Sequence, residues 1–168
     1  MVFIRPIIQT ALLLLAAAVA VPQAFAGDGI IGTWNLVSIS TENTVTGEVT
    51  HPYGDNPHGR LTYTPGGHMM AILTVEGRKR FGANRFAGSV DDQAEAYKTM
   101  NAYAGTYTLT DTGVVHHVEV ASIESWVGSD QVRFTKLEGD TLTIKAPPLP
   151  APPDGQLRVG TLVWQRSE

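Results

Sequence analysis

Apolar and polar residues alternate in short runs along most of the chain, and turn residues such as Gly, Pro, Asn and Asp separate the runs. Runs of this kind, spaced about 10–15 residues apart, are typical of antiparallel strands joined by turns. We expect strands at residues 30–40, 60–64, 68–75, 106–110, 114–123, 131–137, 141–145 and 156–166, with a short return at 48–51. Residues 52–59 and 146–155 are predicted as loops, and the prolines of the second should keep it out of any strand ladder.

One segment has a helical rather than an alternating pattern. Ser89 followed by Asp92 resembles a capping box, and Ala94, Tyr97 and Met100 share a face at helical spacing. We therefore predict one short helix near residues 90–103.

Many short strands linked by hairpins indicate an all-β domain, either a sandwich or a barrel. Consecutive hairpins favour an up-and-down antiparallel β-barrel of about eight strands, because strands adjacent in sequence are then adjacent in space. A barrel of that size is wide enough to enclose one small ligand.

The first 26 residues have the pattern of a secretory signal peptide. Arg5 precedes an apolar run, and Ala24-Phe25-Ala26 is a small-x-small cleavage site. The rival interpretation is a membrane anchor, but the uninterrupted apolar run of about 11 residues is short of the roughly 20 that span a bilayer. We expect a single domain at 27–168, in the periplasm or secreted, with no integral membrane segment after cleavage.

Composition excludes several classes of protein. The chain has no cysteine, which rules out disulfide scaffolds and cysteine-ligated metals. Its net charge of −4 argues against nucleic-acid binding. The sequence has no His-x-His and no His-Glu-x-x-His spacing, so we expect no metal site. It has no Gly-x-Ser-x-Gly motif, so we expect no nucleophilic serine. We also expect no cofactor.

Residues Gly32-Thr33-Trp34 resemble the Gly-x-Trp signature of lipocalins. The runs 59–70, 97–107, 115–119 and 126–133 are similar to a bacterial and fungal family of lipocalin-like domains, and the likeness extends over residues 30–166. The resemblance implies a lipocalin-like barrel in which Arg166, or with less support Arg158, covers Trp34 at the closed end. It implies little about function.

We predict that polar and aromatic side chains line a ligand pocket. His116 shares a strand face with Val114, Val118 and Val120 and should point inward, while His117 should point outward. The predicted ligand-binding residues are Tyr63, His68, Met70, Tyr97, Tyr107, His116, Trp126 and Arg133.

The orientation of Arg133 depends on the phase of its strand. If Val132 and Phe134 face inward, Arg133 faces outward. A bulge after Gly128 would reverse the phase and make Arg133 an interior cation, which would favour an anionic ligand such as a carboxylate.

Three functions remain open at this point. The first is binding of a small, largely apolar ligand, with His116, Tyr63 and Arg133 orienting one polar end. The alternative is a cofactor-free isomerase, cyclase or hydrolase that uses His116 or His68 as acid and base. Such an enzyme should show a central polar cluster with contacts of about 2.6–3.2 Å, whereas a carrier needs only an isolated anchor. The third is an envelope protein acting through its rim loops. The sequence does not indicate the oligomeric state.

Overall fold

The computed structural model describes residues 28–82, 84 and 87–167. The predicted signal peptide at 1–26 lies outside these residues. In the described part of the chain, no helix is both long enough and apolar enough to cross a membrane.

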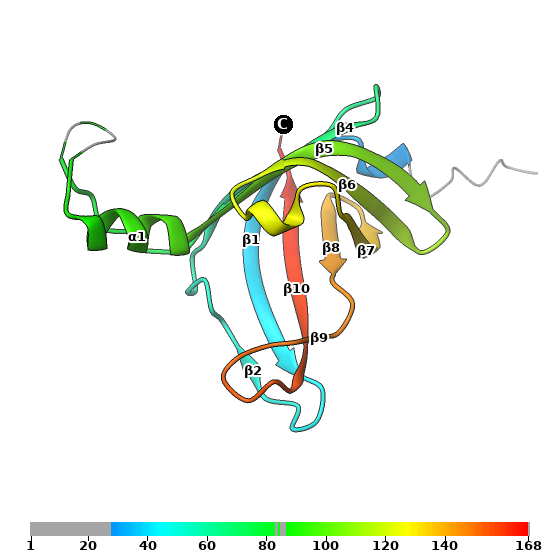
Figure 1. The fold of residues 1–168 in the computed structure, drawn as a ribbon. Helices are drawn as coiled ribbons and strands as arrows, with labels where there is room; N and C mark the ends of the chain where they lie inside the picture. The colour runs from blue at the N-terminus through cyan, green and yellow to red at the C-terminus, as the bar shows by residue number, and fades with distance from the viewer. Residues whose placement is uncertain (1–27, 83, 85–86, 168) are drawn as a thin grey trace, which may run out of the picture.

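Strands dominate the described residues, in an antiparallel arrangement (Figure 1). The strands are β1 (Gly32–Asn43), β2 (Val49–Thr50), β3 (His58–Tyr63), β4 (His68–Thr74), β5 (Met100–Thr110), β6 (Gly113–Ala121), β7 (Asp130–Glu138), β8 (Thr141–Lys145), β9 (Leu149–Pro150) and β10 (Leu157–Arg166). The remaining elements are the helix α1 (Val90–Lys98) and two short 3₁₀ turns, η1 (Asp28–Ile30) and η2 (Glu124–Trp126).

The sheet closes on itself. Strand β1 pairs with both β3 and β10, so the order β1-β3-β4-β5-β6-β7-β8-β10 forms a ring of eight strands. The two-residue strands β2 and β9 extend β1 and β10 at their ends. The predicted up-and-down antiparallel barrel with one short helix is therefore confirmed.

The two ends of the barrel differ. Tight turns join β3 to β4, β5 to β6 and β7 to β8 at one end, which η1 also approaches. The four long connections, at 44–57, 75–99, 122–129 and 146–156, all lie at the opposite end. We call this second end the mouth.

At the closed end a tryptophan seals the core. Trp34 is fully buried, and its indole N–H donates to the Ile30 carbonyl at 2.8 Å. The guanidinium of Arg166 lies over the Trp34 ring, 4.2 Å from its centroid, and also donates to the carbonyls of Ile31 and Gly29. The structure thus places Arg166, and not Arg158, over Trp34.

The predicted helix is too long. α1 begins after Ser89, with the expected capping box between Ser89 and Asp92, but it ends at Lys98. Residues from Met100 onward belong to β5, where the register pairs Leu73 with Asn101. Met100 has the spacing expected for the helical face, but its pairing with β4 places it in a strand. None of the residues in α1 is buried, and the helix projects from the side of the barrel (Figure 1).

Two predicted loops also need correction. His58 and Gly59 open β3 because they pair with Thr74 and Leu73 of β4. Within the proline-rich segment, Leu149 and Pro150 form β9, which pairs with the start of β10. Proline is tolerated there because β9 is at the edge of the sheet.

A bulge changes the inward face of β6. The register shifts between Ala104 and Gly105, so that Val118 faces Gly105 and Val120 faces Ala104, which leaves Glu119 as the extra residue. His116 and Val118 point into the barrel as predicted, but Val120 is 62% exposed on the outside. The expectation that Val120 shares the face of His116 was wrong.

Candidate functional site

A histidine and two tyrosines form a buried polar trio inside the barrel. The Nε2 atom of His116 lies 2.7 Å from the hydroxyl of Tyr63, and its Nδ1 atom lies 3.0 Å from the hydroxyl of Tyr103. Tyr63 comes from β3, Tyr103 from β5 and His116 from β6, so the trio bridges several walls of the barrel. His116 is only 1% exposed.

All three groups are held in their neutral forms. Burial, followed by the positive charge of Arg133, lowers the pKa of His116 to about 3. Burial likewise raises the pKa of Tyr103, and it raises the pKa of Tyr63 well above its usual value. Near neutral pH the trio is therefore an uncharged hydrogen-bonding network.

The trio carries one hydrogen that it does not use internally. The neutral groups bring three polar hydrogens, two from the tyrosines and one from the imidazole, but only two contacts join the groups to one another. If Nδ1 of His116 carries the proton, the Tyr103 oxygen accepts a hydrogen bond from it, and the hydroxyl hydrogen of Tyr103 is then free to donate elsewhere. If Nε2 carries the proton, the spare hydrogen belongs to Tyr63. In either tautomer one buried hydroxyl can donate to an acceptor on a ligand.

A cation lies next to the trio. Arg133 on β7 faces inward, because the register sets it opposite Val114 and sets Gln131 opposite His116. Val132 and Phe134 are 42% and 45% exposed on the outside. Of the two orientations open for Arg133, the structure selects the interior one.

Among the described residues, no carboxylate pairs with the interior charge of Arg133. Its guanidinium donates to the Val132 carbonyl at 2.8 Å, to the Gln131 side chain at 3.2 Å and to the Tyr103 hydroxyl. None of the ion pairs among the described residues includes it. A guanidinium has five N–H donors in a planar fork, so it retains donors for a ligand oxygen.

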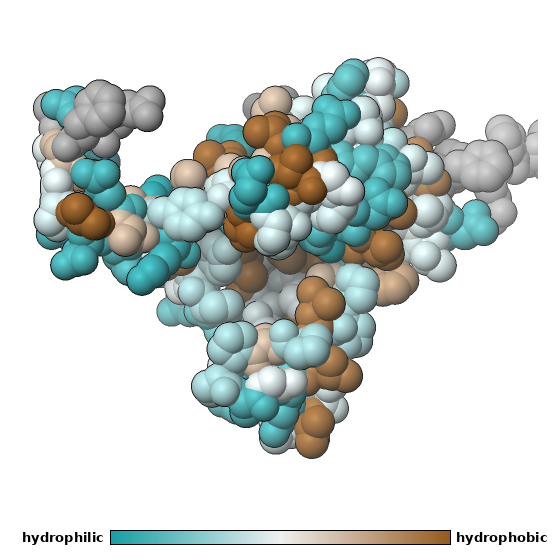
Figure 2. Space-filling model, viewed as in Figure 1, coloured by the Kyte–Doolittle hydropathy of each residue, from teal (hydrophilic) through white to brown (hydrophobic). Residues whose placement is uncertain are grey.

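Aromatic rings flank the polar groups. Tyr107 packs edge-on against Tyr63 with ring centroids 5.0 Å apart. Trp126, on η2 at the mouth, packs edge-on against Tyr103 at 5.5 Å. Figure 2 shows the surface hollowed below η2, in front of β1, β10 and β8. The inward-facing side chains of Gln131 and Arg133 remain partly exposed, consistent with an interior that opens at the mouth.

Three of the predicted ligand-binding residues lie outside the barrel. Met70 is 61% exposed and Tyr97 is 54% exposed, and His68 is also exposed. Tyr63 pairs with Met69, so it is Met69 that shares its inward face. Tyr97 belongs to α1, away from the interior. The structure does unite Tyr63, Tyr107, His116, Trp126 and Arg133.

Tyr103 was not among the predicted ligand-binding residues. The predicted helix extended over it, and this hid its alternation with Gly105 and Tyr107 on β5. The strand pattern of 103–109, taken by itself, is the signal that would have found it.

Hollows on the outer surface compete with the barrel interior. A groove of about 470 Å³ lies on the outer face of β3–β6, and its lining includes Met70, Ile72 and Val120. It is apolar, and within the described chain nothing shows what would cover it.

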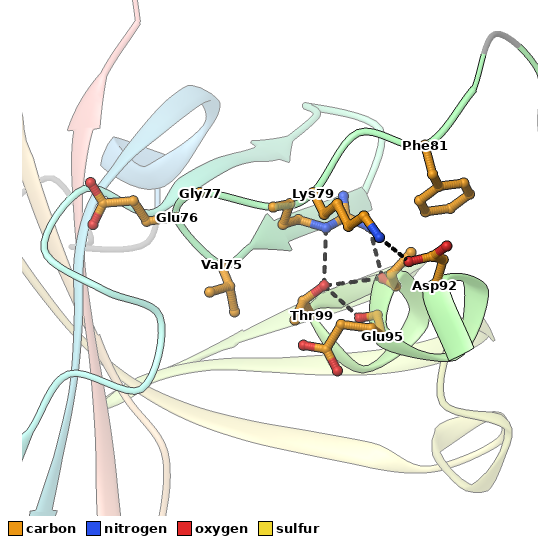
Figure 3. A pocket seen from close by; sticks show the side chains of 10 residues that line it. Val75, Glu76, Gly77, Lys79, Phe81, Asp92, Glu95 and Thr99 are labelled. Atoms are coloured by element: carbon orange, nitrogen blue, oxygen red, sulfur yellow. Dashed lines mark hydrogen bonds and ion pairs between the residues drawn. The ribbon is translucent and has the colours of Figure 1, made fainter. Parts of the chain in front are cut away.

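Another hollow, of about 260 Å³, lies between residues 75–81 and α1 (Figure 3). Its polar groups bind one another. Lys79 forms an ion pair with Asp92 at 2.6 Å, and this lowers the pKa of Asp92 to about 2. Arg78 donates to Thr99 and to the carbonyl of Ala96 near the end of α1. These contacts fasten the loop to the helix and leave few groups for a ligand. Among the described residues, no group of three or more His, Asp or Glu side chains is placed to hold a metal ion.

Comparison with known proteins agrees with this architecture. Residues 31–167 match the family model of the lipocalin-like domain, and the chain belongs to that family. A curated relative is the 4'-hydroxy-3'-methoxypropiophenone carrier protein ppsC of Aspergillus oryzae (strain ATCC 42149 / RIB 40). It is 30% identical over 85 residues, which cover 45% of this chain and 77% of that protein.

Proposed function

We propose that this protein binds a small, largely apolar molecule inside the barrel and holds an acceptor oxygen of that molecule at Arg133 and the spare tyrosine hydroxyl. The observation that carries the proposal is the inward Arg133, which has no carboxylate partner in the described part of the chain and lies beside a neutral Tyr63–His116–Tyr103 trio. Charges that lose part of their hydration inside a protein are normally paired, and Arg133 is partly buried. A ligand carbonyl or carboxylate would satisfy this one.

Three further points support binding. Ligand sites are mostly apolar with a few placed polar groups, and the rings of Tyr107 and Trp126 flank this cluster. The long connections gather at the mouth, where a ligand would pass. The name of the fungal relative describes a carrier of an aryl ketone, a molecule with an apolar body and an acceptor oxygen. Export to the periplasm or the medium, inferred from residues 1–26, is part of the same proposal.

Binding to aryl ketones and aryl carboxylates, measured by thermal shift and native mass spectrometry, tests the proposal. We expect Arg133→Met to weaken binding at least tenfold, since charge-assisted hydrogen bonds are among the stronger ones. Lys136→Met is the matched control. Lys136 is on the same strand but points outward, with its side chain 69% exposed. Wild-type affinity in Arg133→Met, or no binding by any member of either class, would contradict the proposal.

A second candidate is an acid–base enzyme, because the trio contacts of 2.7 and 3.0 Å fall in the range expected for one. The electrostatics oppose it. With its pKa lowered to about 3, His116 is a weak base near neutral pH. The variant His116→Ala distinguishes the two functions. Loss of turnover with retained ligand binding would favour the enzyme.

A further inference from the structure

Two buried tryptophans in the barrel differ in one respect. Trp34 is 0% exposed and Trp164 is 1% exposed. The indole N–H of Trp34 donates to the Ile30 carbonyl, whereas Nε1 of Trp164 has no hydrogen-bond partner among the described residues. Among the buried side-chain atoms without a partner in the described residues, the Trp164 Nε1 is the only donor.

Trp164 points into the barrel. The register on β10 sets it opposite Leu36 of β1 and opposite Leu142 of β8, and Leu142 is fully buried in the core. The next inward residue toward the mouth is Leu162, which remains partly exposed. Trp164 lies one inward position deeper than the partly exposed Leu162, about 7 Å further along the strand. We call Trp164 the floor of the hollow.

An indole N–H usually finds a partner when it is buried, because the unpaired donor loses its water without compensation. A phenylalanine would fill a similar space without that loss. The unpaired donor at the floor therefore points to an acceptor that arrives from outside the chain.

We propose that Trp164 is a second anchor, and that the ligand carries acceptor oxygens at both ends of an apolar body. This inference rests on the proposed function, which supplies the first anchor at Arg133. It defines the ligand class more narrowly. A molecule with a single acceptor oxygen could bond to only one of the two anchors, Arg133 or Trp164.

The register gives the length of such a ligand. One strand, β8, separates β7 from β10, and Leu137, four residues after Arg133, pairs with Leu142, which pairs with Trp164. Strand spacing and rise place the Cα atoms of Arg133 and Trp164 about 16 Å apart along the sheet. Both side chains point inward, so a ligand that reaches both anchors must extend along the barrel axis with an acceptor near each end.

A pair of probes tests the second anchor on the unmodified protein. 4'-Methoxypropiophenone has an acceptor at each end, and 4'-ethylpropiophenone has nearly the same shape but lacks the ether oxygen. We expect both to raise the melting temperature. In ¹H–¹⁵N spectra, only the methoxy compound should move the Trp164 indole signal downfield. The Trp34 indole, already bonded to Ile30, is the internal control and should stay in place.

Trp164→Phe supplies the assignment and the matched variant. It should weaken binding of the methoxy probe about fivefold and leave the ethyl probe unchanged, as expected for loss of a single hydrogen bond. If both probes bind but the Trp164 signal moves equally with each, or with neither, the second anchor is wrong and the proposed function stands. If neither probe binds, the proposed function fails for aryl ketones and the second anchor fails with it.

Discussion

The neutral state of His116 predicts that the protein loses stability as the pH falls below about 6.5. In the folded protein, burial and the nearby Arg133 lower the pKa of His116 to about 3. In the unfolded chain the same imidazole titrates near 6.5. Between these values the unfolded chain binds a proton that the folded protein does not bind, so acid favours unfolding. Above pH 6.5 both states are neutral and the contribution of His116 to stability is fully present.

This linkage amounts to about 2 kcal/mol between pH 8 and pH 5, and to about 4 kcal/mol by pH 3. Urea denaturation at pH 8 and at pH 5 measures it, in the wild type and in His116→Gln, which does not titrate. Both proteins share every other ionisable group, so the variant should lose about 2 kcal/mol less than the wild type over this range. Equal losses in the two proteins would refute the argument that His116 is buried in its neutral form.

The remaining predictions concern the framework of the barrel. A Cβ on Gly105 would overlap the backbone of β6, so Gly105→Ala should cost several kcal/mol, whereas Gly160→Ala meets nothing within 4 Å and should change stability by less than about 0.5 kcal/mol. Similar urea midpoints for these two variants would contradict the geometry. Arg166→Met removes the cation over Trp34 and two bonds to backbone carbonyls, and should cost about 2–3 kcal/mol; calorimetry showing an unchanged melting temperature would contradict it. Ser89→Ala should cost about 1 kcal/mol and speed amide exchange in α1 while leaving the barrel protected; uniform acceleration would argue against a local cap.

The strands were predictable because their signal is local. Period-two alternation between turn residues indicated all eight barrel strands, and the predicted 141–145 coincides with β8. Closure followed from the succession of hairpins, since each strand then lies next to its predecessor. The capping box at Ser89 was equally local: two side chains three residues apart determine where α1 begins.

The errors arose where distant pairing decides the outcome. Residues 100–103 fit a helical spacing as well as a strand, and only their pairing with β4 assigns them to β5. Leu149 and Pro150 form a strand because an edge position on β10 accepts them. Neither partner is visible in the local sequence.

The interior of the site was harder to predict than the fold, because a shift of one residue in strand register turns each inward side chain outward. Met70 points outward because the hairpin register pairs Tyr63 with Met69. The bulge at Glu119 turns Val120 out. The alternation of β7 left Arg133 with two orientations, and its pairing with Val114 selects the inward one.

A crystal structure with a bound aryl ketone is the most direct test of binding inside the barrel. The account predicts that the carbonyl oxygen lies within about 2.7–3.2 Å of the Arg133 guanidinium or of a tyrosine hydroxyl of the trio. A ketone seated in the outer groove beside Met70 and Val120, with the interior polar groups untouched, would contradict it.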